Sequence, residues 1–154
     1  MAKAHSEYDF IFLSVSHGFV KEAVEILRKN NVKGTLVFFC NFWDTRKEVE
    51  EWAGDYVYIL AFPTAGGQMQ DDHLDGVLFD HLMLEGEQKA HISNYTDLTA
   101  LLTSADLKWE VPHDMVEWIW IHNIPTRAKI FLIMSVLRNM VADTVIKPIG
   151  AVTT

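Results

Sequence analysis

Polar or conformationally permissive residues follow three apolar segments of this chain, each at the point where the segment ends. Ser16 opens the tripeptide Ser16-His17-Gly18 after the first segment, and Asn41 follows the second. The third segment runs into Pro63-Thr64-Ala65-Gly66-Gly67. A carboxamide both donates and accepts hydrogen bonds, and glycines let another molecule approach the backbone closely. These three points are therefore candidate binding residues, and the competing interpretation of each is a plain turn.

Other residues of reactive type are weaker candidates. Cys40 is a possible nucleophile, but a small buried residue at a strand end is the favoured interpretation. His73 and His81 have aspartates beside them, which suggests a metal site, yet their spacing matches no common ligand set, so we predict no metal. Neither Gly-x-Gly-x-x-Gly nor the P-loop pattern occurs in the sequence.

The elements that must position the three candidate points are strands and helices in alternation. Nearly unbroken apolar runs predict buried strands over residues 8–15, 35–40 and 56–62. Amphipathic spacing predicts a helix over 19–30, and a capping-box pattern, Thr45 with Glu48, opens another that ends at Ala53 (Asp44 is the alternative cap). This order predicts a parallel sheet. Because ligands of such sheets bind at the carboxyl ends of the strands, the three points should meet there.

The end of the third strand is the point around which the prediction is organised. Tyr58 to Phe62 is almost wholly apolar, as in a strand that is covered on both faces. Pro63 has no N–H to donate to a sheet, so the strand should stop there. We expect the residues after it, Gly66 and Gly67 included, to form a loop that faces a ligand.

After that loop the pattern changes to shorter segments. Residues 73–80, 81–85 and 90–93 are short strand candidates that indicate an antiparallel extension of the sheet, and residues 107–111 are a further short strand. Asn94 can cap a helix that runs to about Ser104, and a further helix starts at residues 112–114. The predicted fold is α/β, a partial Rossmann-like sheet of three parallel strands with helices and an antiparallel extension, followed by C-terminal helices.

The domain prediction places one Rossmann-like domain over residues 1–123 and a divergent helical tail over 124–154. The stretch Ile130–Leu137 is almost wholly apolar. It is too short to span a bilayer, and Lys129 and Arg138 flank it, so a buried or partner-facing helix is favoured.

Composition excludes several classes of partner. The net charge is −8 and the isoelectric point is near 5.2, so nothing would neutralise the phosphates of a nucleic acid or an anionic membrane surface. A single cysteine, Cys40, excludes an internal disulfide and fits a reducing compartment. The first residues have no apolar segment of signal-peptide type. We therefore expect a cytoplasmic protein that binds neither nucleic acid nor membrane.

Several stretches together resemble the ketopantoate reductase family. Phe62-Pro63-Thr64-Ala65-Gly66-Gly67 resembles the family's Phe-Pro-x-Ala-Gly-Gly sequence. Residues 9–15 look like its fourth strand, and Phe38 to Trp43, with Asn41, looks like its fifth strand and the loop that follows. Residues 117–122 look like the start of its long helix. The resemblance covers about residues 8 to 122.

The resemblance implies the distal half of an NADPH-binding Rossmann domain. Family members pass hydride from NADPH to the ketone of a 2-oxo acid, with a lysine as general acid and with an asparagine, here Asn41, that contacts cofactor and substrate. By the same resemblance, Ser16, Asn41, Pro63, Gly66 and Gly67 would face the cofactor.

This sequence also departs from the family pattern. The glycine-rich loop is missing, and the positions of the family's two lysines fall near Ser16 and Trp120. We therefore expect the chain to be inactive alone. The alternative is a non-catalytic association module that binds a second copy or a complementing chain through an exposed sheet edge and its apolar tail. A gene remnant without a function of its own stays a third interpretation.

Overall fold

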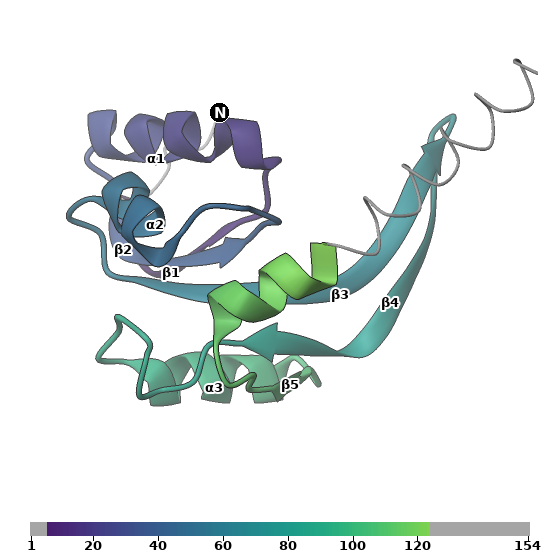
Figure 1. Cartoon of the computed structure of the whole chain (residues 1–154). Helices are drawn as coiled ribbons and strands as arrows, with labels where there is room; N and C mark the ends of the chain where they lie inside the picture. Colours follow the sequence, from purple (N-terminus) through teal and green to yellow (C-terminus); the bar gives the residue numbers. More distant parts are fainter. Residues whose placement is uncertain (1–5, 124–154) are drawn as a thin grey trace, which may run out of the picture. The chain divides into compact units, whose positions relative to one another are not determined.

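The computed structural model describes residues 6–123, with the backbone alone for residues 78–80. A five-stranded sheet in the order β1-β2-β3-β4-β5 forms its centre (Figure 1). β1, β2 and β3 are parallel to one another, β4 is antiparallel to β3, and β5 is parallel to β4. This confirms the predicted partial Rossmann-like sheet with an antiparallel extension. The strands are β1 (Glu7–Leu13), β2 (Lys33–Phe39), β3 (Tyr58–Gln70), β4 (His73–Leu84) and β5 (Lys108–Glu110).

The helices lie close to the predicted segments. A single 3-10 turn, η1, precedes the first helix, and residues 115–123 are helical at the end of the described part. The chain divides into two compact units, residues 1–120 and 121–154. The boundary predicted after residue 123 and the apolar stretch Ile130–Leu137 fall at or beyond the end of the described residues, and they stay predictions. The helices are η1 (His17–Phe19), α1 (Val20–Lys29), α2 (Arg46–Ala53) and α3 (Tyr95–Ser104).

Both faces of the central strands are buried in apolar clusters. Successive side chains of a strand point to opposite faces. Leu36 and Leu60 accordingly belong to the cluster that contains α1 and α2 residues, whereas Val37 and Ile59 belong to the cluster with Leu98 of α3. Figure 1 shows α1 and α2 on one side of the sheet and α3 on the other. The near-continuous apolar runs of the sequence follow from this double burial.

The expected end of β3 at Pro63 is wrong, and so is the expected loop over Gly66 and Gly67. β3 continues to Gln70, and both glycines pair with β4. Proline is tolerated because the β2–β3 pairing ends at Ala61 and because the β3–β4 register shifts between Pro63 and Ala65. Bulges and strand edges are the positions where a missing N–H costs little. The Thr64 hydroxyl donates to the backbone oxygen of His81 at this shift.

The segments after the turn also differ in detail from the prediction. Residues 73–84 form one strand, β4, instead of two, because pairing with β3 continues across the expected break at residues 80–81, from Leu78 with Ala65 to Leu82 with Pro63. Residues 90–93 form no strand, and His91 makes an isolated bridge with Tyr58. α3 and β5 lie within a residue of their predicted positions.

A buried ion pair ties the start of α2 to the end of β4. The Arg46 guanidinium donates to the Glu85 carboxylate, whose side chain is only 1% exposed. The second Glu85 oxygen accepts the backbone N–H of Leu60 at 3.2 Å. Burial raises the pKa of Glu85, although Arg46 acts in the opposite direction. Desolvation therefore outweighs attraction, and Glu85 depends on its partner to stay charged.

We expect Arg46→Met to destabilise the fold by about 3 kcal/mol near pH 8, because it leaves a buried carboxylate without a partner. A raised carboxyl pKa means that the folded state holds its proton more tightly than the unfolded state does. Stability is therefore lost as pH rises from the unfolded carboxyl range through the folded pKa, and the cost of Arg46→Met should shrink near pH 5. Urea unfolding followed by tryptophan fluorescence measures both.

The matched control is the exposed pair of Lys29 and Glu25, 3.7 Å apart on α1. Lys29→Met should cost no more than about 0.5 kcal/mol. The double change Arg46→Met with Glu85→Met should restore most of the loss, since it removes both charges. An Arg46→Met variant as stable as the parent at pH 8 would contradict this account.

Candidate functional site

The ends of the parallel strands bring three of the predicted positions to one edge of the sheet. Leu13 of β1 pairs with Phe38 of β2, so Ser16 and Asn41 each lie three residues beyond a paired position. Phe39 pairs with Ala61 of β3, so Asn41 and Pro63 each lie two residues beyond that pair. Neighbouring strands are about 4.8 Å apart. This register therefore places Ser16, Asn41 and Pro63 near one another, at the end of the sheet toward which the three parallel strands run.

The surroundings of these residues differ. Ser16 is exposed, and its carbonyl accepts the N–H of Phe19 at 2.8 Å as η1 begins. Asn41 is exposed between the buried residues Cys40 and Phe42. Pro63 is half-buried. Gly66 and Gly67 continue outward along the β3–β4 ribbon, so the structure does not bring them to this edge. The binding roles of all five residues stay predictions.

A histidine and an aspartate meet at the same edge. His17 follows β1 and Asp44 follows β2, and the His17 Nε2 lies 2.5 Å from the Asp44 Oδ2. The His17 ring also contacts Trp52 of α2, with centroids 5.3 Å apart. The sequence pattern predicts only a turn at His17 and a possible helix cap at Asp44. Their shared position, directly after neighbouring strands of one parallel sheet, is the signal that could have paired them.

The cap of α2 leaves Asp44 available for this contact. Thr45 is the N-cap, as predicted: its side chain accepts from the Glu48 N–H, and Glu48 accepts the Thr45 N–H at 2.7 Å. These bonds lower the pKa of Glu48. Asp44 is thus not needed as a cap. Its backbone oxygen accepts the indole N–H of Trp120 at 3.3 Å, which fixes its position.

The His17–Asp44 contact fixes the orientation of the imidazole. A carboxylate that binds one imidazole nitrogen leaves the other nitrogen for a second hydrogen bond. The Asp44 side chain is 19% exposed and that of His17 45% exposed, so the carboxylate is the more sheltered partner.

Cys40 lies beside the pair but does not share its chemistry. Its side chain is buried, and burial, with a smaller contribution from the charge of Asp44, raises the pKa of its thiol to about 12. The thiolate is the nucleophilic form. Cys40 is therefore a structural residue at the strand end, in agreement with the favoured interpretation of the sequence.

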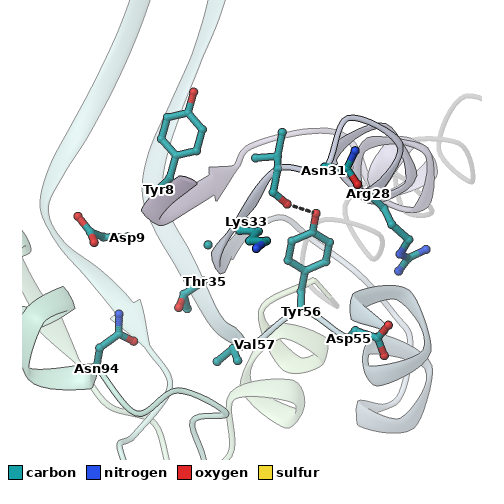
Figure 2. Close-up of a pocket in the computed structure, with 12 residues that line it drawn as sticks. Tyr8, Asp9, Arg28, Asn31, Lys33, Thr35, Asp55, Tyr56, Val57 and Asn94 are labelled. Atoms are coloured by element: carbon teal, nitrogen blue, oxygen red, sulfur yellow. Dashed lines mark hydrogen bonds between the residues drawn. The ribbon is translucent and has the colours of Figure 1, made fainter. Parts of the chain in front are cut away.

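A hollow lies at the opposite end of the parallel strands, near their amino ends. Its volume is about 600 Å³, and Tyr8, Lys33 and Tyr56 are among the residues that line it (Figure 2). The Tyr56 hydroxyl donates to the backbone oxygen of Val32 at 2.6 Å. All these residues belong to or precede the amino ends of the strands. The hollow is consequently separate from the His17–Asp44 edge, and ligands of open α/β sheets bind at the other end.

The histidines considered for a metal are far apart. His73 begins β4 and His81 lies eight residues along the same strand, which corresponds to about 27 Å of extended chain. Across residues 6–123, no three histidine, cysteine or acidic side chains cluster as a metal would require. Within the same residues, no helix has the length and apolar character to cross a membrane.

Comparison with known proteins supports the fold. No protein-family model matches this sequence, and no curated protein does. A dimeric ketopantoate reductase from Staphylococcus aureus has a similar structure, with a TM-score of 0.56 at 12% identity over 77% of this chain. The match spans only 38% of that reductase. At this identity the likeness shows a shared Rossmann-like fold.

Two further solved structures are less similar. A D-mandelate dehydrogenase in complex with NADH has a TM-score of 0.49 at 13% identity, over 75% of this chain and 38% of its own. A pyrroline-5-carboxylate reductase from Coxiella burnetii has a TM-score of 0.42 at 19% identity, over 90% of this chain and 50% of its own.

The Cys40 thiol should resist alkylation in the folded protein. With a pKa of about 12, its thiolate fraction at pH 8 is lower than that of a free cysteine by roughly three orders of magnitude. Iodoacetamide labelling followed by mass spectrometry measures the rate, with the guanidinium-unfolded chain as the fast control. Asp44→Asn should change the rate little, because burial is the larger cause. Labelling of the folded chain at the unfolded rate would contradict the assignment.

Proposed function

We propose that this chain is the substrate-facing half of an NADPH-dependent oxidoreductase that reduces the ketone of a 2-oxo acid. The observation that carries the proposal is the His17–Asp44 pair at the carboxyl edge of three parallel strands. Ligands of doubly wound sheets bind outside that edge. The fold likeness to a ketopantoate reductase and the sequence resemblance to that family support the same reaction class.

The chain's own residues suit the reacting end of such a site. NADPH, when bound, supplies a hydride to the ketone carbon. The ketone oxygen then needs a proton, and the imidazole of His17 donates it while Asp44 stabilises the charged ring. Asn41 stands on the same edge, and its carboxamide can hold a carbonyl, a carboxylate or the cofactor's amide. His17 would thus replace the lysine that the family uses.

The same residues do not suit the phosphate end of the cofactor. No glycine-rich fingerprint occurs in the sequence, and a pyrophosphate normally binds to such a turn and the helix that begins there. We therefore propose that the missing half of the sheet comes from another part of a longer polypeptide or from another chain. Without it, we expect little or no reductase activity.

Calorimetric titration tests the proposal in two steps. NADPH added to the chain should bind weakly, in the millimolar range, and Asn41→Ala should abolish the heat. Asn94→Ala is the matched control, because Asn94 lines the hollow at the opposite end and its side chain makes no capping hydrogen bond. No heat from NADPH at millimolar concentration would refute a nicotinamide site.

The second step uses pyruvate, the smallest common 2-oxo acid, with NADPH present. His17→Gln should weaken pyruvate binding about tenfold or more, since it removes a charge-assisted hydrogen bond. His113→Gln, an exposed histidine on a loop, should leave it unchanged. Equal binding by both variants would remove His17 from the site without affecting the NADPH result.

A second candidate function is association through the free edge of β1. Among residues 6–123, β1 pairs with β2 alone, so within this part of the chain one row of its backbone groups has no strand beside it. Tyr8 is 43% exposed and Phe12 is 42% exposed, and the Phe12 ring lies 5.4 Å from that of Phe39. In a complete doubly wound sheet, a strand of the other half occupies this edge. A complementing chain that supplies a parallel strand would fit it.

Hydrogen exchange of the purified chain separates the two candidates. If a second copy of the chain associates through β1, the outward amides of residues 7–13 should be protected in the purified protein, like those of β2. If the chain has no such partner, these amides should exchange orders of magnitude faster than the amides of β2. Fast exchange together with NADPH binding would favour the reductase half.

A further inference from the structure

The ribbon formed by β3 and β4 continues beyond the rest of the sheet. The β2–β3 pairing ends at Ala61, and the β4–β5 pairing begins at His81. Within the described part of the chain, residues 64–78, called the arm below, therefore pair only with each other, from Ala65–Leu78 to Gln70–His73. Figure 1 shows the arm as the teal hairpin that extends past the other strands.

The arm has one apolar face and one largely polar face. In an antiparallel ladder, paired residues share a face, and successive pairs alternate. The register therefore puts the pair Met69–Leu74 on the same face as the pair Gly67–Gly76. The other face carries the pairs Gln68–Asp75 and Gln70–His73 toward the turn and the pair Gly66–Val77 toward the sheet, where Val77 is 60% exposed. Met69 and Leu74 are each 64% exposed, which is unusual for large apolar side chains in register on one face.

The apolar face combines a projection with a hollow. Met69 and Leu74 project near the turn, and the Gly67–Gly76 pair, two residues back, carries no side chain. The approach at this pair is close, because a Cβ on Gly67 would lie 2.7 Å from the backbone oxygen of Asp75. A hollow of about 470 Å³ opens here, lined by Ala65, Gly66, Gly67, Leu74, Gly76 and Val77. Projection and hollow are about 7 Å apart along the strand.

A two-stranded ribbon with an exposed apolar face needs a cover. Isolated two-stranded hairpins are marginally stable in water, and three strands or a packed face are needed for stability. No charged side chain occupies the apolar face between Ala65 and Met69 or between Leu74 and Gly76. Natural edge strands usually carry such charges to prevent association. The arm is therefore built for contact with another surface.

We infer that the surface is the arm of a second copy of this chain. A two-fold axis near the middle of the arm would exchange the two features, so that Met69 and Leu74 of each copy enter the Gly67–Gly76 hollow of the other. A two-fold interface requires that one patch carry both complementary parts, and this face does. Asp75 lies on the opposite face and would stay in water. The inference goes beyond the proposed reductase function and does not depend on it.

Sedimentation equilibrium of the full chain tests the inference. At high protein concentration the parent chain should have a mass that is twice the 17.6 kDa of one chain. The dimer should dissociate on dilution. Met69→Lys should weaken the dimer by about a hundredfold or more, because it buries an unpaired ammonium group. Gln70→Lys, the adjacent exposed residue on the polar face, makes the same charge change and should leave the dimer intact.

Circular dichroism and the thermal midpoint of each variant show whether it is folded. Leu74→Gln serves as a second apolar-face variant that adds no charge, and it should also weaken the dimer. A parent chain that is monomeric at every concentration would overturn the inference, and so would a dimer that Met69→Lys leaves intact. Equal loss in Met69→Lys and Gln70→Lys would show that added charge, not the apolar face, controls association.

Discussion

The burial of β2 and β3 on both faces is the constraint on which the rest of the structure depends. Each strand sends alternate side chains into two separate apolar clusters, one with α1 and α2 and the other with α3. A one-residue slip would exchange Leu36 and Val37 between clusters of different shape, so the register is fixed strongly. The register in turn fixes where the strands end. The positions of the candidate site residues follow from where those strands end.

Asp44 and Thr45 are neighbours at the start of α2, but only Thr45 caps the helix, which leaves Asp44 to contact a residue after β1. Either residue could cap α2 by type, and a cap is needed because the first N–H groups of a helix have no partner within it. Thr45 with Glu48 meets that need. Asp44 is left beside the end of β1, where its Oδ2 lies 2.5 Å from the His17 Nε2. The pair therefore exists because parallel strands place two loops side by side.

The β3–β4 ribbon follows a different rule from the parallel part. Inside the sheet, helices cover the strands, and apolar side chains are buried. Beyond Pro63 only β4 pairs with β3, and Met69 and Leu74 are exposed. The ion pair of Arg46 with Glu85 holds the other end of β4 against α2, so the base of the ribbon is firmly anchored. The end of β3 is therefore a paired strand with exposed apolar side chains, not the ligand-facing loop that the sequence predicts.

The sequence alone determined the features that depend on neighbouring residues. Apolar runs gave the strands of the parallel part, amphipathic spacing gave α1, and the Thr45-x-x-Glu48 pattern gave the start of α2. The fold class followed, because the order of elements with short connections allows few topologies. In the site, Asn41 was correctly placed at a strand end. These are local properties, and local patterns carry them.

Tertiary structure alone decided what depends on partners distant in sequence. Pro63 looked like a strand end, but whether a strand continues depends on hydrogen bonds from β4, which no local pattern reveals. His17 and Asp44 meet only because Leu13 pairs with Phe38. Arg46 and Glu85, 39 residues apart, meet only after β4 has folded back along β3. Local sequence specifies the conformation of each segment, whereas the register between strands decides which distant residues meet, and the contacts of the candidate site depend on that register.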